Sequence, residues 1–135
     1  METEGGRTTW TWSPRDPMAT YLATVAVGQY TFFEGTAPGG IPLLSAVADE
    51  VVEASGKTGV EAMLGQLPAM MTLFAGRFGP YPFETYGILV VDRPLGFALE
   101  TQTRSLFGSD AWNDPVIQAH ELAHQWFGDS VGLDA

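Results

Sequence analysis

Two histidines and a glutamate form the group of residues with the clearest chemistry in this sequence. His120, Glu121 and His124 stand in the run His-Glu-Leu-Ala-His. On an α-helix, residues four apart lie on nearly the same face, about 40° from one another, so both imidazoles can reach one metal ion while Glu121 points beside it. The spacing predicts a zinc site with a general base next to it.

The chemistry of such a site explains why these residue types are needed. Neutral imidazole nitrogens bind zinc at about 2.0–2.1 Å, and a catalytic site uses about three protein ligands plus a water whose pKa falls to about 7. Glu121 is placed to take a proton from that water as it attacks a carbonyl, and to pass it to the departing amine. The alternative interpretation is a structural helix with two core histidines and a surface glutamate.

A helix around this motif is indicated by its flanking residues. Asp114 followed by Pro115 is a typical helix start, with an N-cap and a proline at the first helical position. Gly128 is a stop signal. Between them an apolar stripe with helical spacing is formed by Val116, Ala119, His120, Ala123 and Phe127. We therefore expect the site to lie in the wall of a core.

The longer run around the motif resembles a known family. Residues 120–131 closely resemble the active-site helix of the aminopeptidase N family, the gluzincins with a thermolysin-like catalytic domain. Residues 96–103 are similar to the exopeptidase strand of that family, Gly-Ala-Met-Glu-Asn, in which Ala98 and Glu100 agree. The three positions that depart from it are Phe97, Leu99 and Thr101. Residues 17–22 and 78–83 also resemble family segments.

The resemblance implies an α+β fold in two parts. Residues 1–35 are expected to be the closing strands of an N-terminal β-domain. Residues 36–135 are expected to be the first part of a thermolysin-like zinc peptidase domain, with a mixed sheet and the active-site helix. The turn cluster at 35–40, rich in glycine, is the expected boundary.

The resemblance also implies a role for each site residue. His120 and His124 hold zinc, Glu121 is the general base, and Glu100 holds the free α-amine of a peptide substrate. Alternation along a strand from 97 to 104 puts Ala98 and Gln102 on the face of Glu100, at a sheet edge that binds the substrate backbone by strand addition. Taken alone, Glu100 has a rival interpretation as a solvated edge carboxylate that discourages aggregation.

Part of the family's site has no counterpart in this sequence. The third zinc ligand of the family is a glutamate nineteen residues after the second histidine, which corresponds to position 143, and the sequence ends at Ala135. The family's catalytic tyrosine lies further on. We expect a fragment that is inactive alone and binds zinc weakly or not at all.

The expected function of the parent protein is that of a zinc metallopeptidase, most simply an aminopeptidase that removes N-terminal residues. Two alternatives stay open. An endopeptidase of the same fold is suggested by Phe97, which departs from the exopeptidase pattern. The other is a catalytically inactive β-sheet interaction module. The intact Glu121 argues against it, because an inactive binding protein would not need this residue.

The amino-acid composition excludes some classes of binding partner. The chain has 16 acidic and 6 basic residues, a net charge of −10 and no cysteine. Nucleic acids and anionic membranes select clustered lysine and arginine, so neither is an expected partner, and disulfides and thiolate zinc sites are excluded. No apolar run approaches the roughly 20 residues that span a bilayer. We expect a soluble bacterial protein, either cytoplasmic or secreted.

The remaining elements are predicted from local patterns. Strands are expected at 8–12, where Trp10 and Trp12 would pack on a sheet rather than form a ligand platform, and at 20–33, 41–47 and 86–91. A helical turn is expected at 48–54. A helix opened by a capping box of Thr58 and Glu61 should be kinked or divided at Pro68. Asp129 is placed equally well to orient a ligand histidine or to be a polar residue at a helix end.

Overall fold

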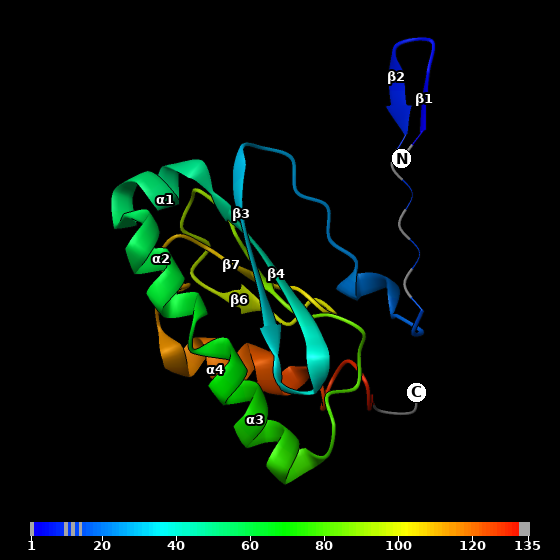
Figure 1. Ribbon diagram of the computed structural model, residues 1–135, viewed down its shortest axis with the longest axis vertical. Helices are drawn as coiled ribbons and strands as arrows, with labels where there is room; N and C mark the ends of the chain where they lie inside the picture. The colour runs from blue at the N-terminus through cyan, green and yellow to red at the C-terminus, as the bar shows by residue number, and fades with distance from the viewer. Residues whose placement is uncertain (1, 10, 12, 14, 133–135) are drawn as a thin grey trace.

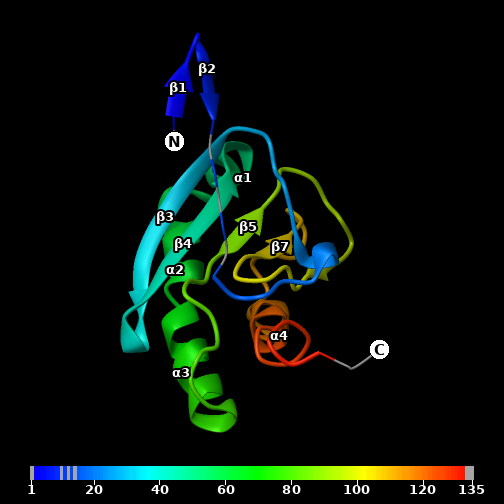
Figure 2. The ribbon, with the colours of Figure 1, turned by 90° about the vertical axis from the view of Figure 1, so that its right-hand side faces the viewer.

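A mixed five-stranded sheet is the centre of the computed structural model, which describes residues 2–9, 11, 13 and 15–132. Its strand order is β3-β4-β5-β7-β6 (Figures 1 and 2). The strands are β3 (Tyr30–Ala37), β4 (Ile41–Ala48), β5 (Ile88–Val90), β6 (Ala98–Leu99) and β7 (Ser105–Phe107). The predicted α+β class with a mixed sheet is confirmed.

The two halves of the sheet differ in strand direction. β3 and β4 form an antiparallel hairpin, whereas β4 with β5 and β5 with β7 pair in parallel. β6 returns antiparallel to β7, with Ala98 opposite Phe107, and is the free edge of the sheet. The segment that resembles the exopeptidase strand is therefore an edge, as the resemblance implied.

Three helices cover one face of the sheet. They are α1 (Asp49–Ser55), α2 (Lys57–Leu64) and α3 (Leu67–Phe78), and they follow β4 in the chain (Figure 1). Pro68 lies in the first turn of α3, so the predicted division of the helix at this proline is confirmed. The predicted capping box is wrong: α2 starts after Gly56 without a side-chain cap, and Glu61 lies 4.0 Å from the Lys57 ammonium instead.

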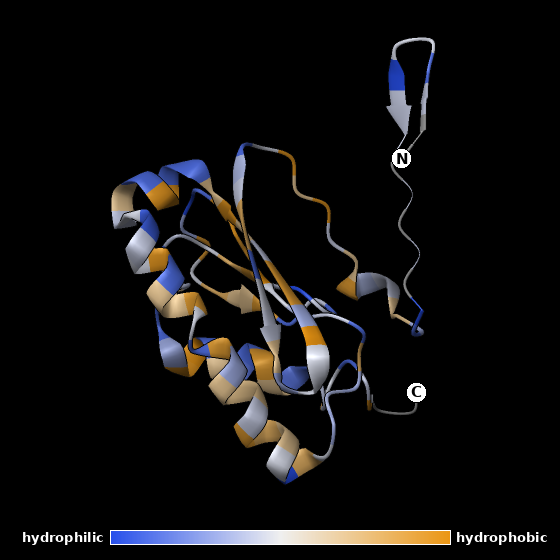
Figure 3. Cartoon of the chain, viewed as in Figure 1, coloured by the Kyte–Doolittle hydropathy of each residue, from blue (hydrophilic) through white to orange (hydrophobic). Residues whose placement is uncertain are grey.

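The core lies between these helices and the central strands. Tyr86, Ile88, Val90 and Phe107 are fully buried and belong to one hydrophobic core cluster. The hydropathy colouring of Figure 3 shows hydrophobic residues along both the strands and the helices. This packing confirms the predicted strands at 41–47 and near 86–91, and the helical turn after residue 48. A fourth helix, α4 (Pro115–His124), contacts α3 and β6.

The N-terminal segment runs over the other face of the sheet (Figure 2). A hairpin of β1 (Glu2–Glu4) and β2 (Arg7–Thr9) precedes it, so the predicted strand at 8–12 holds only at its start, and Trp10 and Trp12 lie outside the described residues. The predicted strand at 20–33 is wrong for its first ten residues, which form the short helix η1 (Thr20–Leu22) and an irregular stretch. Val25 and Val27 favour extended backbone but pair with no strand of the described part of the chain, and their exposures are 91% and 93%.

The turn cluster proves shorter than predicted. Residues 35–37 continue β3, where Gly35 pairs with Leu43, and the turn occupies only Pro38–Gly40. A junction between residues 35 and 36 therefore falls inside a continuous strand, and the division of the chain into two domains stays a prediction. None of the helices in the described part of the chain is long and apolar enough to cross a bilayer.

Candidate metal centre

Helix α4 carries the histidine motif and begins where the sequence predicts. The Asp114 carboxylate accepts the backbone N–H of Val116 at 2.8 Å and, more weakly, that of Ile117 at 3.4 Å, and Pro115 occupies the first turn. These bonds satisfy amides that have no partner within the helix. The helix ends at His124 and continues as tight turns, so Gly128, at φ 129°, lies four residues beyond the end.

The buried face of α4 is not the predicted apolar stripe. Val116 and Phe127 are 75% and 55% exposed. The buried positions are Gln118, Glu121, Leu122, Gln125 and Trp126. They also follow helical spacing, but three of the five are polar. Gln118 and Gln125 donate hydrogen bonds to backbone carbonyls, and a hydrophobic pattern does not detect such residues.

The two histidine rings converge at one point. The Nε2 atoms of His120 and His124 lie 3.1 Å apart, with ring centroids 4.7 Å apart and the ring planes at 83°. Two nitrogens bound to one tetrahedral zinc at about 2.05 Å would be about 3.3 Å apart. The spacing of the two nitrogens is therefore that of a metal-binding pair.

A backbone contact determines which ring nitrogen of His124 is free to bind a metal. Its Nδ1 lies 3.1 Å from the carbonyl oxygen of Phe127. Because a carbonyl only accepts, Nδ1 of the neutral ring must carry the proton, and Nε2 is left with its lone pair toward His120. This is the arrangement that metal-ligating histidines usually have.

Glu121 lies beside this pair with an unused oxygen. The residue is 5% exposed, and its Oε2 atom is buried without a hydrogen-bond partner. Burial raises the pKa of Glu121, while the positive charges of His120 and His124 lower it and the negative charge of Glu100 raises it. A buried carboxylate with a free oxygen is suited to receive a proton from a group held at the histidines.

These features together test whether the residues fit zinc. Two nitrogens have the right separation, one has its tautomer fixed, and a partnerless carboxylate oxygen lies nearby. Across residues 2–9, 11, 13 and 15–132, no group of three His, Cys, Asp or Glu side chains is arranged to hold a metal ion. The described residues thus fit two of the ligands of a zinc site.

The predicted substrate residues lie at the end of the edge strand, but not on one strand face. β6 ends at Leu99, so the predicted strand through residue 104 is wrong. Glu100 is half-buried just beyond β6, and its negative charge raises the pKa of both Glu121 and Asp129. Ala98 remains in the strand, opposite Phe107.

Gln102 departs from its predicted position. It lies in a turn, is 7% exposed, and donates from Nε2 to the carbonyl oxygen of Pro17 at 3.2 Å. The turn has an internal bond from the Arg104 amide to the Thr101 carbonyl, and Thr103 has the left-handed φ of 65°. Alternation cannot continue through such a turn, so Gln102 does not share a strand face with Glu100.

Similarity to known proteins agrees with this geometry. No protein-family model matches the chain. The M1 zinc metallopeptidase of Deinococcus radiodurans, in a variant bound to a Tyr-Ser-Ala substrate, is 30% identical and superposes with a TM-score of 0.71 over 87% of this chain and 27% of that one. Aminopeptidase M1-A of Oryza sativa subsp. japonica is 30% identical over 132 residues, and aminopeptidase A of Gloydius brevicauda is 29% identical over 130 residues. This chain matches part of the aminopeptidase N family.

The match to the aminopeptidase N family covers most of this chain but only a small part of its relatives. It covers 87% of this chain, but the chain spans only 13% and 14% of those two curated relatives. The resemblance to the family and the α+β fold of its M1 peptidases are thus confirmed for the segment that carries the histidine motif.

Two buried residues directly after the histidine motif were not predicted from the sequence. Trp126 donates from Nε1 to the carbonyls of Gly79 and Pro80, both at 3.1 Å, and joins the end of α4 to the end of α3. Gln125 is fully buried and bonds to residues 100–103. Their position directly after His124, in the run that resembles the family, is the only sequence signal for them.

Among the described residues, Asp129 makes no side-chain hydrogen bond to either histidine of the motif. Its Oδ2 accepts Nε2 of Gln125 at 2.7 Å, whereas His124 is oriented by Phe127. Burial raises the pKa of Asp129 to about 7, and the charge of Glu100 adds to the rise. Of the two interpretations that the sequence left open, the polar residue at a helix end is the one observed.

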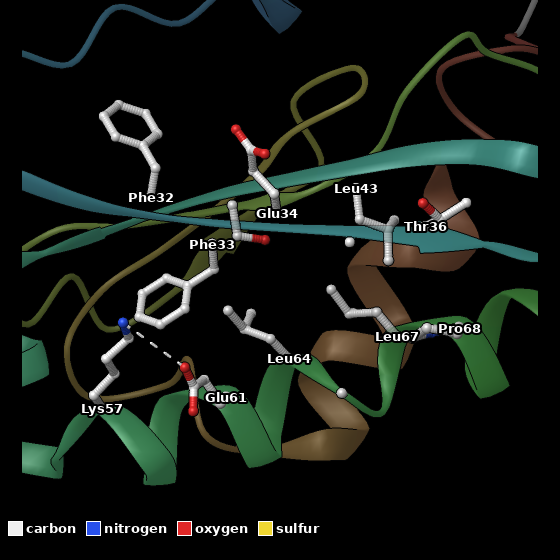
Figure 4. A pocket seen from close by; sticks show the side chains of 13 residues that line it. Phe32, Phe33, Glu34, Thr36, Leu43, Lys57, Glu61, Leu64, Leu67 and Pro68 are labelled. Carbon is white, nitrogen blue, oxygen red and sulfur yellow. Dashed lines mark ion pairs between the residues drawn. The ribbon is translucent and has the colours of Figure 1, made fainter.

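A cavity of about 510 Å³ lies away from the residues of the histidine motif. It opens between β3 and helices α2 and α3 and is lined mainly by apolar side chains, with the Lys57–Glu61 ion pair at one end (Figure 4). Neither histidine, Glu121 nor Glu100 lines it. The two histidines instead lie at the surface of α4, where His120 is exposed.

Proposed function

We propose that this chain forms part of a zinc-dependent aminopeptidase in which His120 and His124 are zinc ligands and Glu121 is the general base. The observation that carries the proposal is the 3.1 Å approach of the two Nε2 atoms beside a buried Glu121 oxygen that has no partner. A helix with two core histidines would not need a buried glutamate with an unsatisfied oxygen next to them.

In this proposal each residue of the site has a separate role in peptide hydrolysis. Zinc, when bound, supplies a Lewis acid that polarises a carbonyl and lowers the pKa of water to about 7. His120 and His124 hold the metal through Nε2, and the Phe127 carbonyl keeps the His124 ring in place. Glu121 accepts the proton of the attacking water at its free oxygen and delivers it to the departing amine.

Glu100 is proposed to select substrates with a free N-terminus. It follows the edge strand β6, whose open side can bind a peptide backbone by strand addition. Its backbone carbonyl accepts Nε2 of Gln125, the residue after His124, at 3.2 Å, which supports a position near the histidine motif. The related M1 metallopeptidase variants bound to L-arginine, L-tryptophan or a Tyr-Ser-Ala substrate agree with amino acid and peptide ligands for this chain.

The third zinc ligand is proposed to come from outside the described residues. This is supported by the two-ligand set at α4 and by the small share of the relatives that the chain spans. We accordingly expect the 135-residue chain alone to hydrolyse peptides poorly.

The test is a comparison of peptides in the full-length protein that contains this chain. We expect release of the first residue from peptides with a free N-terminus, little action on the same peptides acetylated, and loss of activity with a chelator. Glu121→Gln should keep zinc and lower kcat by about 10²–10⁴-fold. Retained activity in Glu121→Gln would remove it as the base. Equal cleavage of acetylated peptides would favour an endopeptidase, and zinc-free protein without activity would favour a β-sheet interaction module.

A further inference from the structure

Gln125 is the residue that ties the metal-binding helix to the proposed substrate edge. It follows His124 directly, caps the C-terminus of α4 and is fully buried. Its amide nitrogen donates to the carbonyl oxygens of Glu100 at 3.2 Å and Thr101 at 3.5 Å. Its amide oxygen accepts the backbone N–H of Thr103 at 2.7 Å. One side chain thus bonds to three of the four residues from 100 to 103.

These partners fix the orientation of the amide. A backbone N–H can only donate and a backbone carbonyl can only accept, so the oxygen of Gln125 must face Thr103 and the nitrogen must face Glu100. The Asp129 carboxylate accepts the same nitrogen at 2.7 Å and holds it from the other side. The flipped amide would lose all of these bonds.

The backbone that Gln125 holds is unusual. Among the described residues, Thr103 is the only one other than glycine with a positive φ, 65°. A β-branched residue rarely adopts this left-handed conformation, and it persists only where the surroundings stabilise it. The hydrogen bond from the Thr103 amide to Gln125 stabilises this conformation. The turn that contains Thr103 follows directly after Glu100.

We propose that Gln125 is a positioning residue that sets Glu100 relative to the two histidines, and so determines how well the site recognises a free N-terminus. The inference rests on the proposed role of Glu100. Gln125 itself touches no reacting group. The residue before it, His124, is a proposed zinc ligand, and the side-chain amide of Gln125 bonds to the backbone of Glu100. One buried side chain therefore sets the distance between the proposed metal site and the proposed amine site.

The chain offers a matched control in Gln118. This residue lies on the same helix, is equally buried, and donates to the carbonyl oxygen of Trp112, in the loop before α4. No hydrogen bond joins it to residues 98–103 among the described residues. Gln118→Met therefore removes a buried amide of α4 without affecting a hydrogen bond to the segment that contains Glu100.

The first experiment needs no activity. Amide hydrogen exchange of Thr103 is measured in the 135-residue chain, with Gln125→Met, Gln118→Met and the core amide of Leu89 as reference. Relative to Leu89, exchange at Thr103 should become at least about tenfold faster in Gln125→Met and stay unchanged in Gln118→Met. Unchanged protection of Thr103 in Gln125→Met would overturn the proposal. If that variant does not fold, Gln125→Asn, whose amide is too short to reach both carbonyls and the amide, replaces it with the same expectation.

The second experiment separates positioning from a general loss of structure. In the full-length protein, Gln125→Met should raise KM for free N-terminal peptides about tenfold, lower kcat by less than about threefold and keep its zinc. Gln118→Met should leave KM near the wild-type value. An equal rise of KM in both variants, or loss of zinc in Gln125→Met, would overturn the proposal. If the unmutated protein shows no preference for free N-termini, the proposed function fails, whereas the exchange result for Thr103 still stands.

Discussion

The Nδ1 atom of His124 lies 3.1 Å from the carbonyl oxygen of Phe127, while its Nε2 atom lies 3.1 Å from Nε2 of His120. The first contact places a proton on Nδ1 of the neutral His124 ring, so the proton in the second contact must belong to His120. Without metal, the two rings are thus in different tautomers.

This difference predicts a specific response to zinc. Both Nε2 atoms must be unprotonated to bind the metal, so zinc should move the His120 proton from Nε2 to Nδ1 and leave the His124 tautomer unchanged. Ring ¹⁵N chemical shifts measured above pH 8, with and without zinc, check this. A metal-free His124 protonated at Nε2 would contradict the geometry, and His120→Ala assigns the signals.

The start of α4 depends on one carboxylate. Asp114→Ala removes the acceptor for the Val116 and Ile117 amides and should lower the free energy of unfolding by about 1 kcal/mol. Asp114→Ser keeps a capping oxygen and should lose much less. Denaturant unfolding measures both, and an alanine variant as stable as the wild type would show that the cap contributes nothing.

A buried pair of hydroxyl groups joins the segment just before β5 to strand β7. Tyr86 Oη and Ser105 Oγ lie 3.0 Å apart, with both residues fully buried. Tyr86→Phe leaves the serine without its partner and should cost about 1–2 kcal/mol of unfolding free energy. Ser105→Ala in the same chain should add little further loss, because the unsatisfied group is then gone. Strictly additive losses would contradict this coupling.

Acid should weaken the loop that leads into β6. The backbone N–H of Leu95 holds the pKa of Asp110 below its usual value, and that of Gly96 adds to the effect. A lowered folded-state pKa contributes stability at neutral pH that is lost as pH falls through that pKa, below about 4. Asp110→Asn should therefore be less stable than the wild type at pH 7, with a difference that shrinks toward pH 2. Thermal unfolding across this range would contradict the account if the difference stayed constant.

Local signals predicted those parts of the fold that local chemistry determines. Pro68 divides α2 from α3, and Asp114 with Pro115 starts α4, because each acts on the backbone within its own turn. The strand prediction at 20–33 was wrong because β-propensity reports an extended backbone, whereas a strand also needs a partner.

The arrangement of the site depends on contacts between distant residues. The motif spacing predicted the convergence of His120 and His124, since it is a property of one helix. The turn after Glu100 was missed because it is held by Gln125, which lies 22 residues beyond Thr103 in the sequence. The buried face of α4 was missed because Gln118 and Gln125 are polar residues that donate to backbone carbonyls, and a search for apolar residues does not find them.

The central claim is that His120 and His124 form a zinc-binding pair, and calorimetric titration of the metal-free full-length protein that contains this chain, with zinc at neutral pH, tests it most directly. The account predicts one zinc ion bound per chain, binding retained in Glu121→Gln, and the heat lost in the double variant His120→Ala, His124→Ala. Equal zinc binding by the wild type and the double variant, or no binding by either, would contradict it.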